Sequence, residues 1–178
     1  MKMKWGEAMQ LETERLILRK YRETDLEDLF AYLSDAQVVA FEPYKPMAED
    51  EVRDNLAWRM STEEMLAIEE KATGRMIGNV YLGNRDFESK ELGYVLNRNY
   101  WGKGYAAEAC AAVIQAALSA ETHRIYAECD PMNTASWKLL ERLGFVREAH
   151  FRQNVYFWTD GQGKPIWKDT YVYSLLAK

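Results

Sequence analysis

The chain has 178 residues, of which 48% are hydrophobic and 29% are charged, and its formal net charge is −5. These values are typical of a soluble globular protein, and we predict one domain over residues 1–178. The acidic charge argues against a nucleic-acid partner, because phosphate binding favours a basic face. The sequence has neither an apolar run near the roughly 18 residues of a membrane span nor a signal peptide, so we predict a cytoplasmic protein without a membrane partner.

The first elements are a strand and a helix. Alternating apolar and polar residues predict a strand over 11–21. Residues 24–34 carry an apolar stripe at helical spacing, and Thr24 and Glu27 have the spacing of a capping box. We therefore expect the first helix to begin at Thr24.

The middle of the chain predicts a second helix and three strands. The prolines in 41–46 exclude regular helix there, and a helical pattern resumes over 49–60. Short polar links then separate three apolar segments, at 64–70, 75–83 and 91–97. Links of this size join antiparallel hairpins.

The second half alternates helices and strands. A helix begins near Tyr105, and a strand over 123–129 and a helix over 133–145 follow. Two long strands around a polar turn at 159–165 close the chain. Because a helix joins the strands 91–97 and 123–129, we expect them to be parallel neighbours in an otherwise antiparallel α/β sheet. Ligands bind at the carboxyl ends of such strands.

The segment NYWGKGYAAEA, residues 99–109, lies at that place. Gly102 and Gly104 indicate a left-handed backbone or a close approach to another group. The helix that begins near Tyr105 would present unpartnered N–H groups and the positive end of its dipole, which together favour a phosphate, and Lys103 adds a positive charge. A glycine turn that only joins a strand to a helix is the alternative.

Two known phosphate loops fit this segment poorly. The Walker pattern requires a glycine where this chain has Asn97, and a serine or threonine where it has Gly104. The Rossmann pattern is matched by Gly102, Gly104 and Ala107, with Glu128 at the end of the following strand. However, too many residues separate the preceding strand from Gly102, and too few parallel strands can follow. A nucleotide-binding redox domain is therefore the less favoured alternative.

Three segments together resemble the GNAT N-acetyltransferases, in particular the RimJ/RimL-like branch. They are TERLILRKYRETDLEDL near the start, ELGYVLNRNYWGKGYAAEA in the middle and NTASWKLLERLGF near the end. The resemblance implies the GNAT fold, a mixed sheet whose two parallel strands splay apart. It also implies direct transfer of an acetyl group from acetyl-CoA to a primary amine in a ternary complex. A catalytically silent acyl-CoA-binding or regulatory module is the alternative.

The same resemblance implies that acetyl-CoA is the cofactor, that no metal is needed, and which residues bind acetyl-CoA. The pyrophosphate would contact the loop formed by Gly102, Lys103, Gly104, Tyr105 and Ala106. The pantetheine would pair as an extra strand with the backbone of Val95 and Asn97, and the Leu96 N–H would polarise the thioester carbonyl. Asn133 would hold the pantetheine, although it is also a plausible helix cap. Asn99 replaces a long polar residue of the family, so phosphate binding should depend more on backbone amides.

The resemblance also implies the residues for chemistry. Glu91 is our candidate for the base, directly or through a water molecule. Leu140 occupies the position at which many GNAT enzymes carry a tyrosine that acts as the general acid. Ser136 matches the serine of the ribosomal-protein branch, so we assign to Ser136 the protonation of the CoA thiolate. A second carboxylate of that branch would fall at Val155, which cannot serve, and this puts a ribosomal-protein substrate in doubt. Tyr44 lies in the loop that roofs the site and is our substrate contact.

The remaining polar and aromatic residues predict structure rather than chemistry. Cys110 and Cys129 are expected to be reduced thiols, and His123 and His150 have no metal-ligand spacing. An aromatic cluster near the last turn indicates core or an oligomer surface, with a wall of the acceptor pocket as the alternative: Tyr156, Phe157, Trp158 and Trp167. A homodimer is the oligomer that we consider. The acceptor remains open between a protein N-terminus, a polyamine, an aminoglycoside-like drug and an amino-acid analogue.

Overall fold

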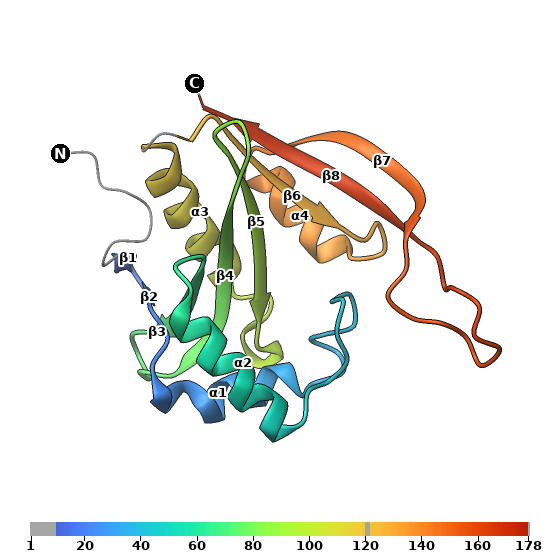
Figure 1. Ribbon diagram of the computed structural model, residues 1–178. Coiled ribbons are helices and arrows are strands. Elements are labelled where there is room, and N and C mark those ends of the chain that lie inside the picture. Colours follow the sequence, from blue (N-terminus) through green and yellow to red (C-terminus); the bar gives the residue numbers. More distant parts are fainter. Residues whose placement is uncertain (1–9, 120–121, 178) are drawn as a thin grey trace.

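The computed structural model describes residues 10–119 and 122–177, which form an eight-stranded mixed sheet with helices on both faces (Figure 1). The strand order is β1-β2-β3-β4-β5-β6-β8-β7. The strands are β1 (Leu11–Glu12), β2 (Leu16–Arg19), β3 (Met65–Glu70), β4 (Met76–Arg85), β5 (Ser89–Leu96), β6 (Arg124–Cys129), β7 (Val146–Val155) and β8 (Lys168–Leu176). The helices are α1 (Leu26–Leu33), α2 (Glu49–Ser61), α3 (Tyr105–Leu118) and α4 (Thr134–Arg142), with short 3₁₀ turns η1 (Glu23–Asp25) and η2 (Arg98–Tyr100).

The start of the chain differs from the prediction in two places. The single strand expected over 11–21 is a tight hairpin of β1 and β2, because the Thr13 N–H donates to the Leu16 carbonyl at 3.0 Å. The capping box expected at Thr24 is also wrong. The Asp25 carboxylate instead accepts the Arg22 N–H at 2.8 Å, and η1 precedes α1. Asp25 takes this role because its buried ion pair with Arg19 fixes it at the start of the helical segment.

The hairpin of β4 and β5 is longer than predicted. Pairing continues to Arg85 and Ser89, so only three residues form the link. Phe87 and Glu88 there adopt positive φ angles of 57° and 53°, a conformation that pattern analysis assigns to glycine or asparagine.

The parallel pair is present and short, as the predicted splayed sheet requires. Only Ser89–Glu91 of β5 pair with Arg124–Tyr126 of β6. Beyond these residues the two strands diverge, so that β5 keeps β4 on one side and has an open edge on the other (Figure 1). The α/β fold with a splayed parallel pair is therefore confirmed.

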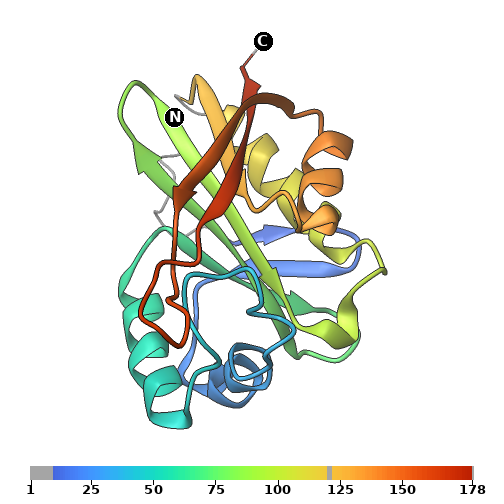
Figure 2. The same ribbon diagram turned by 90° about the vertical axis from the view of Figure 1, so that its right-hand side faces the viewer.

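Two apolar clusters hold the helices against the sheet. One includes Val113 of α3 and Leu140 of α4, and the other includes Leu29 of α1 and Val52 of α2. Figure 2 shows α1 and α2 on the opposite side of the sheet from α3 and α4. At the divergence of β5 and β6, the helix N-termini of α3 and α4 and the loop before α2 all reach the same cavity.

Candidate active site

A cavity of about 1160 Å³ lies where the parallel strands separate. It extends from α2 and the preceding loop, across β5, to the N-termini of α3 and α4. Most residues that the sequence singled out line it: Tyr44, Glu91, Val95, Leu96, Gly102, Gly104, Tyr105, Ala106, Asn133 and Ser136. Asn97 and Lys103 do not line it. The fold thus brings together residues that lie more than 90 positions apart in sequence.

The N-terminus of α3 presents backbone donors to this cavity. Gly102 and Gly104 have φ angles of 72° and 82°, the left-handed conformation expected of them. A Cβ on Gly102 would meet no atom within 4 Å, so the backbone conformation, rather than packing against the protein, accounts for the glycine. Among the described residues, the N–H groups of Tyr105 and Ala106 have no acceptor. An anion would satisfy them.

Arg15 of the β1–β2 turn holds the glycine turn before α3 in place. Pattern analysis did not identify Arg15. Its Nη1 donates to the Lys103 carbonyl at 2.9 Å, and its Nε donates to Glu108 at 2.7 Å. The Lys103 ammonium itself lies 5.2 Å from the ring centre of Tyr100. The loop is therefore held by a residue 88 positions away, a contact that no local motif signals.

The backbone groups that face the gap along the open edge of β5 belong to other residues than those predicted. The Asn97 N–H donates to the Ile77 carbonyl of β4 at 2.8 Å, so it is not available to a ligand. Backbone groups alternate between the two sides of a strand, so Val95 also faces β4, while Tyr94 and Leu96 face the gap. The Leu96 carbonyl accepts from the Trp101 indole at 2.7 Å. Its N–H faces the gap.

Two carboxylates lie on one face of the diverging strands. Glu91 is ion-paired with Arg85, whose guanidinium also donates to the Tyr81 hydroxyl at 3.0 Å. Glu128 of β6 is two residues beyond Tyr126, the register partner of Glu91, and therefore points to the same face. Desolvation at the cavity wall, with a smaller effect of Glu91, raises the pKa of Glu128. Sequence reasoning missed Glu128, because the register that aligns Glu91 with Tyr126 is a tertiary contact.

Two hydroxyls lie at the N-terminus of α4. The Asn133 side chain accepts the Ser136 N–H at 3.2 Å, so it caps the helix as expected. The Ser136 Oγ lies 2.9 Å from the Tyr94 hydroxyl of β5. Burial raises the pKa of Tyr94, so its hydroxyl is protonated at neutral pH. Tyr94 was not identified from sequence, because the family pattern directs attention to position 140, and Leu140 is fully buried in the core.

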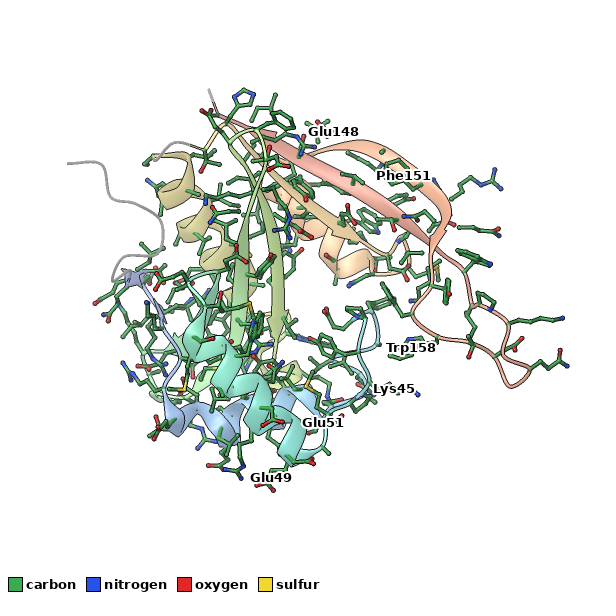
Figure 3. The ribbon with its side chains drawn as sticks, in the orientation of Figure 1. Lys45, Glu49, Glu51, Glu148, Phe151 and Trp158 are labelled. Carbon is green, nitrogen blue, oxygen red and sulfur yellow. The ribbon has the colours of Figure 1, made fainter. Side chains whose placement is uncertain are left out.

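A roof and a buried cation complete the cavity on the α2 side. Tyr44 is half-buried in the loop before α2. The neighbouring Lys45 lies 5.2 Å from the ring centre of Trp158, and Figure 3 shows the two side chains facing each other across the space between this loop and the β7–β8 turn. Arg59 of α2 lines the cavity with only 4% of its surface exposed.

The other predicted features have structural partners. Burial raises the pKa of the Cys129 thiol, at the cavity wall, to about 11. His150 pairs with Asp169 at 2.7 Å. Within residues 10–119 and 122–177, no group of three or more His, Cys, Asp or Glu side chains is placed to hold a metal ion. Tyr156 and Trp167 stack edge-to-face and are about half-exposed, so the aromatic cluster is not core, while Phe157 lines the cavity.

The helices in the described part of the chain are too short or too polar to cross a membrane.

Comparisons with known proteins agree on one family. The model of the acetyltransferase (GNAT) domain matches residues 15–146. An uncharacterized N-acetyltransferase p20 of Bacillus licheniformis is 35% identical over 177 residues, covering 94% of this chain and 96% of that protein. The [ribosomal protein uS5]-alanine N-acetyltransferase of Escherichia coli is 26% identical, covering 90% and 87%. A GNAT-family acetyltransferase structure from Bacillus anthracis superposes with a TM-score of 0.86 at 29% identity, covering 95% and 99%. The chain therefore belongs to the GNAT family of acetyltransferases, enzymes that transfer an acetyl group to an amine.

Proposed function

We propose that this protein uses acetyl-CoA as its donor and acetylates a primary amine by direct transfer in a ternary complex. One observation carries this proposal: the open edge of β5 and the free N–H groups of α3 border the same cavity. A strand edge suits an amide-bearing arm, and a helix N-terminus suits a pyrophosphate. Coenzyme A carries both groups in one molecule.

The donor would be held mainly by backbone. The N–H groups of Tyr105 and Ala106 would bind the pyrophosphate, with Gly102 and Gly104 leaving room for its oxygens. Along β5, the pantetheine amides would pair with Tyr94 and Leu96 rather than with the residues first expected. The Leu96 N–H, which faces the gap, would donate to the thioester carbonyl oxygen as negative charge develops on it.

The acceptor amine enters as an ammonium and must lose a proton before it attacks. Glu91 and Glu128 lie on the same face near the gap, and they are the candidates to take this proton, directly or through water. Glu128 has no ion-pair partner among the described residues, whereas Glu91 is held by Arg85. Its raised pKa makes Glu128 the better proton acceptor near neutral pH.

The departing thiolate needs a proton. The hydroxyls of Ser136 and Tyr94 are in hydrogen-bonding contact at the cavity wall, so Ser136 would donate its proton to the sulfur and recover one from Tyr94. A proton from water would then restore the Tyr94 hydroxyl. Cys129 is the only cysteine that lines this cavity among the described residues. Because its pKa of about 11 keeps it protonated at neutral pH, a covalent acetyl-cysteine intermediate is disfavoured. Direct transfer therefore suits this site better than a two-step route.

Calorimetry with acetyl-CoA, followed by an assay of CoA release with a panel of amines, tests the proposal. We expect saturable acetyl-CoA binding and amine-dependent CoA release. Binding without release for any amine would favour the silent module. Binding of NAD in place of acetyl-CoA would favour a redox domain. The panel should include peptide N-termini, because one relative is a [ribosomal protein uS5]-alanine N-acetyltransferase.

A further inference from the structure

We infer that the acceptor carries a carboxylate as well as its amine, and that Arg59 of α2 binds this carboxylate. The inference rests on the proposed function and specifies its substrate class. An amino acid or amino-acid analogue has this chemistry, and a polyamine lacks it.

Arg59 is a buried cation that forms no ion pair with any described residue. Its Nε donates to the Asn55 amide oxygen at 2.5 Å and its Nη1 donates to the Tyr21 hydroxyl at 2.8 Å. Both partners are neutral. A guanidinium has five N–H groups, so three remain without an acceptor among the described residues. No carboxylate of the described residues lies within 4 Å of it.

The other buried arginine of the same fold shows what a completed site looks like. Arg19 is also 4% exposed, and it is matched by two carboxylates. Asp25 accepts two hydrogen bonds from it at 2.8 Å, and Glu69 accepts a third at 2.5 Å. Buried charges are normally paired in this way, because desolvation of a lone ion is costly. Arg19 is structural, whereas Arg59 lines the cavity and has N–H groups that no described residue accepts.

The surroundings of Arg59 suit an incoming carboxylate. Glu42 lines the same cavity without an ion pair to Arg59. Burial raises the pKa of its carboxyl, against smaller lowering effects of a hydrogen bond from Tyr44 and of the Arg59 charge. Tyr44 and Asn79 also line this part of the cavity and offer neutral hydrogen-bonding groups. A planar guanidinium binds a carboxylate in a bidentate manner, which fixes orientation as well as affinity.

The charges on the two sides of the cavity would orient such an acceptor. Arg59 lies on the α2 side, while Glu91 and Glu128 lie at the gap between β5 and β6. A carboxylate held at Arg59 would direct the amine toward the two glutamates and away from the cation. A diamine would place its second ammonium beside Arg59, where like charges repel.

The experiment compares matched acceptors. CoA release is measured with α-amino acids that have apolar side chains and with ω-amino acids of increasing length, each beside its own carboxamide and a diamine of equal length. Binding of the same compounds to the protein–CoA complex is measured by calorimetry, so that the comparison does not depend on turnover. We expect a carboxylate to improve kcat/KM or affinity by about 10- to 100-fold over the carboxamide, the range for a hydrogen bond to a charged group.

Two variants with opposite expected effects keep the test sharp. Arg59→Gln should remove the preference for the carboxylate and leave the affinity for acetyl-CoA unchanged. Glu42→Gln should strengthen binding of the carboxylate, because it removes a nearby negative charge. The matched control is Arg53→Gln on the same helix, since Arg53 is exposed and paired only with Glu49. Thermal melting shows whether each variant folds.

The outcomes separate this inference from the proposed function. Equal use of carboxylates and carboxamides, or a preference for diamines, would overturn the inference and leave acetyl transfer intact. Absence of turnover with every amine would contradict the proposed function, and the calorimetric comparison would still decide whether Arg59 binds carboxylates. An unchanged preference in Arg59→Gln, with a folded protein, would also overturn it.

Discussion

The hydroxyls of Ser136 and Tyr94 lie 2.9 Å apart at the cavity wall, and the Tyr94 hydroxyl also lies 3.1 Å from the Ser136 carbonyl oxygen. This contact sets the first prediction at the residue scale. Ser136→Ala should lower kcat by roughly 10²-fold with little change in acetyl-CoA affinity, because the proton is needed only in the transition state. Tyr94→Phe should lower kcat less, since water can reprotonate the serine. The double variant should be no slower than Ser136→Ala alone. Stopped-flow measurement of CoA release checks this, and additive losses would show that the two hydroxyls act separately.

Leu140→Tyr, which would place a tyrosine where many GNAT enzymes have one, should not restore activity to Ser136→Ala. Leu140 is fully buried in the apolar cluster beneath α3 and α4. A tyrosine there would overpack the core at a cost of about 1–3 kcal/mol and bury a hydroxyl. The hydroxyl of Tyr94 already serves this region from the neighbouring strand.

The two glutamates give a prediction about pH. Glu128 must be ionised to accept a proton, and its pKa is raised, so the rate should fall as the pH drops through that raised value. Glu91 contributes to the shift, so Glu91→Gln should move the acidic limb of the kcat/KM profile to lower pH. Glu128→Gln should lower the rate by roughly 10²-fold and remove that limb. If Glu91→Gln alone removes the limb, the base is Glu91.

At the scale of elements, the turn before α3 combines two left-handed glycines with a remote arginine. Arg15→Met should loosen the Lys103 carbonyl and weaken acetyl-CoA binding by about tenfold, the value of one charge-assisted hydrogen bond. Gly104→Val should weaken binding more and also lower stability, because a β-branched residue at a φ of 82° is strained. Calorimetry and thermal melting separate the two effects. The control is Arg22→Met, whose guanidinium is also ion-paired and lies outside the cavity.

The same element shows how far sequence reasoning reaches. The helix start near Tyr105, the left-handed glycines and the Asn133 cap follow from local rules, and the structure has all three. The local rules did not predict which backbone groups of β5 face the gap. A shift of one residue reverses which backbone groups face the gap, and the Asn97–Ile77 hydrogen bond that sets the phase is a tertiary contact. Local patterns locate a strand more reliably than they determine which of its backbone groups face each neighbouring side.

At the scale of the whole molecule, the sheet is nearly two sheets. Three residues of β5 and three of β6 form its only parallel junction in the described chain. A ligand that pairs with β5 and contacts α3 and α4 would bridge the two parts. Acetyl-CoA at 100 times its Kd should stabilise the fold by about 2.7 kcal/mol and raise the melting temperature by roughly 5–10 °C. NAD should leave it unchanged in a thermal-shift assay.

Family membership and fold could be predicted because the glycine turn, the helix after it and the segment from Asn133 occur together in order. The contributions of Arg15, Arg59, Tyr94 and Glu128 could not. Each depends on a contact between residues far apart in sequence, or on burial that only the packed helices create. The substrate preference that we infer from Arg59 belongs to this second kind of information, because it depends on the absence of an ion-pair partner among the described residues.

The proposed donor contacts have one consequence for the enzyme at work. The turn before α3 and the edge of β5 would recognise phosphate and pantetheine, and both groups remain in the molecule after the acetyl group has left. Among these contacts, only the Leu96 N–H would distinguish donor from product. Free CoA should therefore compete with acetyl-CoA at comparable affinity, and the rate in a cell would follow the ratio of the two rather than the concentration of either.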